Sequence, residues 1–85
     1  MERINLETLS ITELYKLQKA CTLLYEKKNG EYIGMKSTVN PRNYELYDGI
    51  FEEMERKMKK YMIVRDKVLS ELERRIESIE DEEEN

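Results

Sequence analysis

Histidine and cysteine, two residue types that catalytic sites use often, are absent or nearly absent from this sequence. The chain contains no histidine, which removes the commonest general base, any Ser-His or Cys-His nucleophile pair and the Glu-x-x-His ligands of di-iron bundles. The single cysteine is Cys21. Three leucines share its face of a predicted helix, Leu14, Leu17 and Leu24, which favours a small core residue over a reactive thiol. The three scattered glycines form no phosphate or calcium loop. We therefore predict a protein that is not an enzyme and needs no cofactor or metal.

One dense group of basic side chains could contact phosphates. Its members are Arg56, Lys57, Lys59, Lys60 and Lys67. Acidic neighbours weaken its field, namely Glu52, Glu53 and Glu55, and the whole chain carries a formal charge of -4. Binding of nucleic acid relies on a strong positive potential. We interpret the cluster as a solvated helix face, with a small nucleic-acid-binding regulator as the alternative function.

The composition indicates one small helical domain. The chain has 85 residues, of which 40% are charged and 39% hydrophobic, with one proline and three glycines. Few turn-forming residues favour helices over many short strands, so the predicted fold class is all-α. A chain of this length buries a modest core, which a second copy or a partner often completes.

Neither end of the chain reads as a targeting segment. Residues 1–10 carry charges and lack the apolar core of a signal peptide. No run approaches the roughly 20 apolar residues that a bilayer span needs. One cysteine cannot form an internal disulfide, so we predict a cytoplasmic location. The last residues are almost entirely acidic, and we predict a single domain over residues 1–79 followed by a disordered acidic tail, residues 80–85.

A first helix is predicted from about residue 11 to residue 28. Ser10 and Glu13, in the sequence SITE, have the form of a capping box at its start. Apolar residues then recur on one face: Ile11, Leu14, Leu17, Ala20, Cys21, Leu24 and Tyr25. The segment EKKNG supplies late lysines and a glycine at which the helix could end.

The next segment, residues 29–40, contains two glycines and no sustained periodicity. We therefore predict a connection of about a dozen residues, with a short extended piece at Tyr32 to Met35. A β-hairpin turn at Asn29-Gly30 is the alternative.

A second, longer helix is predicted over residues 41–79. Asn40 is a suitable N-cap, and Pro41 suits the first helical position. Gly49 could kink the helix. The apolar stripe comprises Tyr44, Tyr47, Phe51, Met54, Met58, Tyr61, Met62, Val68, Leu69, Leu72, Ile76 and Ile79. Its mixed steps of three and four residues do not read as a strict seven-residue repeat, so we expect a bundle of fairly straight helices rather than a long zipper.

The second predicted helix is longer than the first, so part of its apolar stripe needs cover from a partner. At 1.5 Å per residue the first helix reaches about 27 Å and the second about 58 Å. An antiparallel hairpin would then cover the second helix only to about Met58 to Tyr61. We predict a helix-loop-helix that is completed as a bundle by homodimerisation or by a larger protein partner. The predicted partner surface comprises Tyr61, Met62, Arg65, Val68, Leu69, Leu72, Ile76 and Ile79.

Arg65 is the charged residue in the centre of this stripe, and two interpretations of it stay open. A buried arginine must be paired, either with Asn5 or Glu7 of the leading segment or with a carboxylate of a second chain. In that position it could fix register and oligomeric state. Alternatively, its methylene groups lie along the stripe while the guanidinium reaches solvent. The predicted function is a non-enzymatic protein–protein interaction or regulatory module that acts through the apolar face of the second helix.

Overall fold

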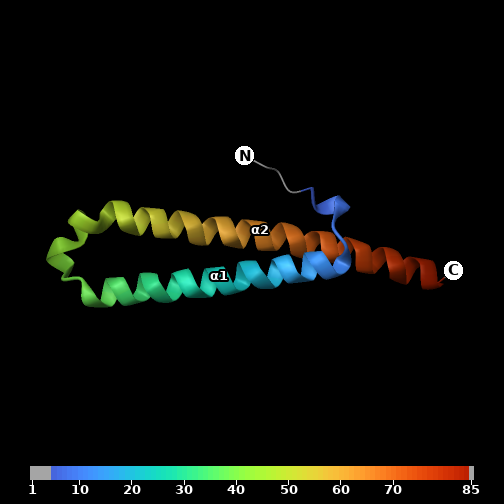
Figure 1. The fold of residues 1–85 in the computed structure, drawn as a ribbon, viewed down its shortest axis with the longest axis horizontal. Coiled ribbons are helices and arrows are strands. Elements are labelled where there is room, and N and C mark those ends of the chain that lie inside the picture. Colours follow the sequence, from blue (N-terminus) through green and yellow to red (C-terminus); the bar gives the residue numbers. More distant parts are fainter. Residues whose placement is uncertain (1–4, 85) are drawn as a thin grey trace.

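The computed structural model describes residues 5–84, and it describes side chains over residues 5–79. Two long antiparallel helices lie side by side and are joined by a short connection (Figure 1): α1 spans Ile11–Thr38 and α2 spans Tyr44–Glu84. A short 3₁₀ helix precedes each of them, η1 (Leu6–Thr8) and η2 (Pro41–Asn43). The described residues contain no strand. The predicted all-α hairpin, with a shorter first and a longer second helix, is confirmed.

α1 begins at the predicted residue because Ser10 caps it. The Glu13 amide donates to the Ser10 hydroxyl, and the Ser10 amide donates to the Glu13 carboxylate, each at 3.1 Å. This capping box satisfies amides that the start of a helix leaves without intrahelical partners.

The predicted end of the first helix at residue 28 is wrong, because α1 continues through Gly30 and Gly34 to Thr38. The predicted connection over residues 29–40, its extended piece and the alternative β-hairpin turn are therefore also wrong. A glycine inside a helix costs about 1 kcal/mol relative to alanine. Packing against α2 offsets this cost, since the ring of Tyr32 meets that of Phe51 edge-on at 5.8 Å.

The true connection is short and is fastened at both sides. Val39 ends α1 by donating its amide to the Met35 carbonyl at 2.9 Å. Asn40 caps η2, as its side chain accepts from the Arg42 amide at 3.0 Å. The Tyr44 hydroxyl then donates to a carbonyl near the end of α1, that of Lys36, at 2.8 Å. The predicted N-cap at Asn40 is confirmed, although a 3₁₀ helix precedes α2.

α2 is one helix along its whole length, and it passes Gly49 without interruption. It also runs through Glu84, beyond the predicted end at residue 79. The disordered acidic tail was predicted for residues 80–85, whose side chains lie outside the described part of the chain. That prediction therefore stays a prediction.

Both helices carry a strict seven-residue repeat that faces the other helix, and we name these residues the inner seam. On α1 and its C-cap they are Leu14, Gln18, Cys21, Tyr25, Lys28, Tyr32, Met35 and Val39. On α2 they are Tyr44, Tyr47, Phe51, Met54, Met58, Tyr61, Arg65, Val68, Leu72 and Arg75. Every one is buried or half-buried. The expectation that no strict repeat exists is wrong, because it merged the inner seam of α2 with a second row of apolar residues beside it. Alternating steps of three and four are typical of an antiparallel coiled coil.

The core of the described residues is thin. Leu14 and Val68 are fully buried, and the other buried side chains are Cys21, Phe51 and Met54. Because α1 is ten residues longer than predicted, it covers α2 beyond Tyr61 and encloses Val68 within a single chain. The predicted limit of coverage at Met58 to Tyr61 is therefore wrong. The prediction that Cys21 is a core residue is confirmed.

Candidate interaction surface

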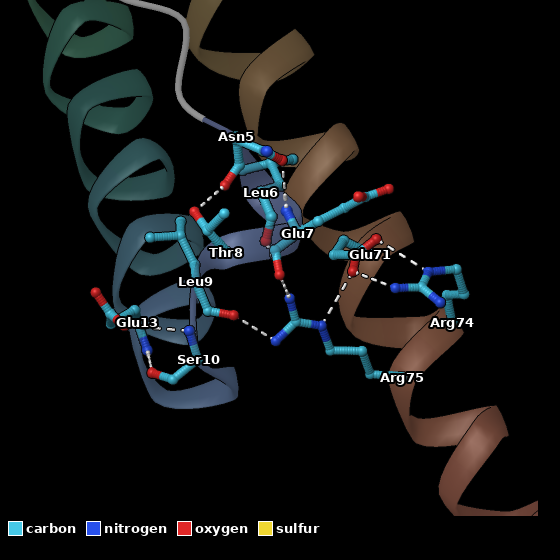
Figure 2. A network of polar contacts seen from close by, with 10 residues as sticks. All are labelled: Asn5, Leu6, Glu7, Thr8, Leu9, Ser10, Glu13, Glu71, Arg74 and Arg75. Carbon is cyan, nitrogen blue, oxygen red and sulfur yellow. Dashed lines mark hydrogen bonds and ion pairs between the residues drawn. The ribbon is translucent and has the colours of Figure 1, made fainter.

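The N-terminal segment is fastened to α2 by Arg75 (Figure 2). The guanidinium donates to the carbonyls of Leu6 at 3.0 Å and Glu7 at 3.1 Å, and also to the Leu9 carbonyl. Its Nε donates to a Glu71 carboxylate oxygen at 3.0 Å. Five donors in a planar fork let arginine gather several acceptors in this way. We name this arrangement the Arg75 clamp.

Asn5 shapes the segment that the clamp holds. Its side chain accepts from the Glu7 amide at 3.1 Å, and its carbonyl accepts from the Thr8 hydroxyl at 2.8 Å. The resulting turn, η1, directs several carbonyls to one side, where Arg75 lies (Figure 2). Carbonyls at the end of a helical turn carry partial negative charge, so a cation is favoured there.

Glu71 anchors the other side of the clamp. It accepts from Arg75 and also from Arg74, at 2.6 and 3.1 Å. Hydrogen bonds from Arg74 and Arg75 lower the pKa of Glu71 to about 2. Charge-assisted pairs of this kind hold their geometry well. The sequence signal for Arg75 is the seven-residue spacing from Tyr61 through Val68, which places residue 75 in the inner seam.

Arg65 lies in the inner seam near Cys21, on the side of α2 that faces α1. Burial raises the pKa of the Cys21 thiol, and the Arg65 charge lowers it in part. The Arg65 Nε is buried without a hydrogen-bond partner among residues 5–79, while Nη2 reaches a surface carboxylate of Asp66 at 3.4 Å. Asn5 and Glu7, the predicted neighbours of Arg65 within the chain, belong to the Arg75 clamp instead.

The structure divides the predicted partner surface into two rows. Tyr61, Arg65 and Val68 belong to the inner seam, so Val68 is not accessible to a partner. The second row lies beside it and includes three exposed side chains, Leu69 at 41%, Ile76 at 50% and Ile79 at 45%. We name this row the outer stripe: Met62, Leu69, Ile76 and Ile79, with Leu72 of the inner seam bordering it. Leu69, Leu72 and Ile76 line a shallow groove together with Glu73 and Glu77.

The basic residues of the alternative function all lie on exposed positions of α2. They are Arg56, Lys57, Lys59, Lys60 and Lys67. Lys57 is within 3.5 Å of the Glu53 carboxylate, one turn earlier on the same helix. The acidic neighbours predicted to weaken the positive field therefore lie directly beside it.

An aromatic cluster at the turn end was not predicted. Tyr32, Tyr44 and Tyr47 surround Phe51, and the Lys36 ammonium lies 5.1 to 5.8 Å from three of the ring centroids. The Tyr32 hydroxyl donates to Glu55 at 2.5 Å. Cation–π contacts and aromatic edges stabilise such a cluster. The sequence signal for this cluster is the seven-residue spacing from Gln18 through Tyr25 to Tyr32, which continues past Gly30.

Further comparisons give no family assignment. Over the described residues, neither helix combines the length and apolar character needed to cross a membrane. No group of three or more potential metal ligands lies together within that same part of the chain. No family model, no curated protein and no solved structure matches the sequence.

Proposed function

We propose that the chain is a non-enzymatic protein–protein interaction or regulatory module that acts through the outer stripe of α2. The observation that carries this proposal is the line of exposed Leu69, Ile76 and Ile79 beside a half-buried Leu72. Fully burying a leucine or isoleucine side chain is favourable by about 1.5–3 kcal/mol. A contiguous exposed apolar row is therefore a typical mark of an interaction site.

The surroundings of the only thiol support a non-enzymatic role. Cys21 is buried in the inner seam, and burial raises its pKa, which keeps the thiol protonated and weakly nucleophilic. A cytoplasmic location is part of the proposal. It rests on the single cysteine of the sequence, which cannot form an internal disulfide, so that nothing in the chain calls for an oxidising compartment.

Photo-crosslinking in the expressing cell tests this proposal. A photoreactive amino acid at Leu69 or at Ile76 is expected to give a discrete covalent adduct with protein. The matched control is Leu46, which is 80% exposed but lies outside the outer stripe. Adducts of equal yield at Leu46, or none at Leu69 and Ile76, would overturn the proposal.

Binding of nucleic acid through the basic cluster is the alternative that a second measurement separates. Phosphate contacts release counterions, so such binding falls steeply with added salt. We expect no salt-dependent change in the fluorescence anisotropy of labelled DNA or RNA. A steep salt dependence that disappears in Lys59→Gln with Lys60→Gln would favour the alternative instead.

A further inference from the structure

One flank of the hairpin continues the outer stripe onto α1. The inner seams set Cys21 opposite Arg65, and the effect of the Arg65 charge on the Cys21 thiol agrees with this register. On α2, one row of residues lies directly beside the inner seam, because each member comes immediately after a seam residue in the sequence. This row includes Met62, Leu69 and Ile76. On α1, Tyr15 and Thr22 likewise come immediately after the inner-seam residues Leu14 and Cys21. In an antiparallel pair of helices these equivalent positions lie on the same flank.

Contacts at the turn end confirm which residues share each flank. The Tyr32 hydroxyl donates to Glu55 across the two helices at 2.5 Å, and the Lys36 ammonium lies 5.2 Å from the ring centroid of Phe51 on α2. Lys36 and Glu55 occupy the same type of position as Tyr15 and Leu69. On the other flank, the pKa of Glu31 is lowered by Lys28 and more weakly by Lys57. The flank with Tyr15, Thr22, Met62, Leu69 and Ile76 therefore forms one face, which we name the dimer flank.

The charged residues that border the dimer flank are complementary between the two helices. Lys19 and Glu26 lie along the α1 border of the dimer flank, and Asp66 and Lys59 lie along its α2 border. All four are exposed, and within residues 5–79 neither Lys19, Glu26 nor Lys59 forms an ion pair. Along the length of the hairpin, the register sets Lys19 level with Asp66 and Glu26 level with Lys59.

We propose that a second copy of this chain packs against the dimer flank. The long axes of the two hairpins are parallel, and the turns that connect their helices lie at the same end. A two-fold axis along the rod then packs α1 of each protomer on α2 of the other. Lys19 meets Asp66 of the second copy, Glu26 meets its Lys59, and Tyr15 packs near its Leu69. The result is a four-helix bundle with matched charges along both edges. This inference rests on the proposed function and names its partner.

The opposite orientation is disfavoured by charge. If the turns lay at opposite ends with the axis between Leu69 and Leu72, α2 would pack on α2 of the second copy. Asp66 would then face the Glu73 of that copy. Like charges that face each other across an interface repel and so disfavour this arrangement.

Charge reversal in the purified chain tests the proposed dimer. The mass is measured by sedimentation equilibrium from micromolar to hundreds of micromolar, for the parent, Lys19→Glu, Asp66→Lys and the double variant. Lys27→Glu is the control, because it changes the net charge equally on an exposed α1 position of the other flank. Circular dichroism checks that each variant is helical.

The parent is expected to have twice the monomer mass of 10.3 kDa. Each single reversal should weaken dimerisation by about tenfold or more, and the double variant should restore it, while Lys27→Glu behaves as the parent. A monomeric parent, or single reversals that match Lys27→Glu, would overturn the inference. So would stronger dimerisation of Asp66→Lys, which the opposite orientation predicts.

A distance measurement tests the orientation independently. In a Cys21→Ala background, a spin label at Arg42→Cys marks the turn. The distance between the two labels is expected to be well below the 64 Å length of the molecule, and a distance near or above that length would contradict the proposal. If the purified chain is monomeric but still forms crosslinked adducts with protein at Leu69 in cells, the dimer inference is contradicted and the proposed function is retained.

Discussion

Two arginines of the inner seam, Arg65 and Arg75, are accommodated in different ways. Arg75 lies at the end of the seam, where the carbonyls of the leading segment and the Glu71 carboxylate accept its donors. Arg65 lies between two helices, where α1 presents the small side chain of Cys21 and no acceptor for Nε. A buried donor without a partner costs about 1–3 kcal/mol, so Arg75 stabilises the fold while Arg65 strains it.

Replacing Arg65 by methionine should stabilise the chain. Methionine has a similar length and adapts to an irregular seam, and it removes the buried Nε and the charge. We expect the free energy of unfolding to rise by about 1 kcal/mol or more, measured by urea denaturation. Arg65→Glu should lower it, because a carboxylate would be desolvated without a partner. Values within about 0.5 kcal/mol of the parent for both variants would show that Arg65 acts as an ordinary surface residue.

The Arg75 clamp should hold the leading segment in a way that lysine cannot reproduce. Arg75→Lys keeps the charge but loses the planar fork that reaches several carbonyls at once. We expect faster hydrogen exchange at the Thr8 and Leu9 amides, which are bonded within η1, with unchanged exchange in the centre of α2. Equal exchange rates in the two proteins would contradict the clamp.

The lowered pKa of Glu71 predicts a loss of stability in acid. Its folded pKa of about 2 lies below the ordinary value of 4.5, so its contribution is complete above about pH 4.5 and is lost as the pH falls toward 2. The parent should therefore exceed Glu71→Gln in stability at pH 7, and the two should converge near pH 2. Urea unfolding at several pH values measures this difference. Glu73→Gln, an exposed neighbour without an ion pair in the described residues, should run parallel to the parent.

At the scale of the element, α1 shows that packing decides where a helix ends. Its second half contains Gly30 and Gly34, yet Tyr32 and Met35 continue the inner seam and hold the backbone helical against α2. Hydroxyls of Ser37 and Thr38 bond to carbonyls four residues earlier in the last turn. Most helical stability in proteins comes from such packing rather than from intrinsic propensity.

Alanine at the two helical glycines should therefore stabilise the chain. Neither glycine has a positive φ, and a Cβ at either position would meet nothing within 4 Å. Gly30→Ala and Gly34→Ala should each raise the free energy of unfolding by about 0.5–1 kcal/mol, measured by thermal and urea denaturation. Gly49→Ala in α2 is the matched control and should gain the same amount. A loss of stability at residue 30 or 34, with a gain at residue 49, would mean that this half of α1 is not helical in solution.

At the scale of the whole molecule, the hairpin is a thin rod whose dimer flank leaves Tyr15, Leu69 and Ile76 exposed. Only five apolar side chains are buried among the described residues, two of them fully, which is little for a chain of 85 residues. A second hairpin on the dimer flank would convert a two-layer rod into a bundle with a central core. Its stability would then depend on protein concentration.

Removal of residues 80–85 should leave this assembly unchanged. The deleted run contains no apolar residue to bury. We expect the same molecular mass and a melting temperature equal to that of the full chain. A lower mass or a loss of cooperative unfolding would show that the acidic run takes part in the fold.

The sequence by itself determined the features that local chemistry controls. The capping box at Ser10, the N-cap at Asn40 and the apolar stripe of α2 were all readable, because each depends on neighbours a few residues away. Together they were sufficient for the helical hairpin and for one undivided apolar stripe on its second helix.

The tertiary structure alone decided how that stripe is divided. On a wide apolar face, the residues that meet α1 depend on where α1 lies, and this placed Val68 inside and Leu69 outside. The end of α1 and the Arg75 clamp likewise depend on contacts between residues far apart in the sequence. Such contacts contribute energies comparable to the cost of a helical glycine, about 1 kcal/mol, and so they override the local signals.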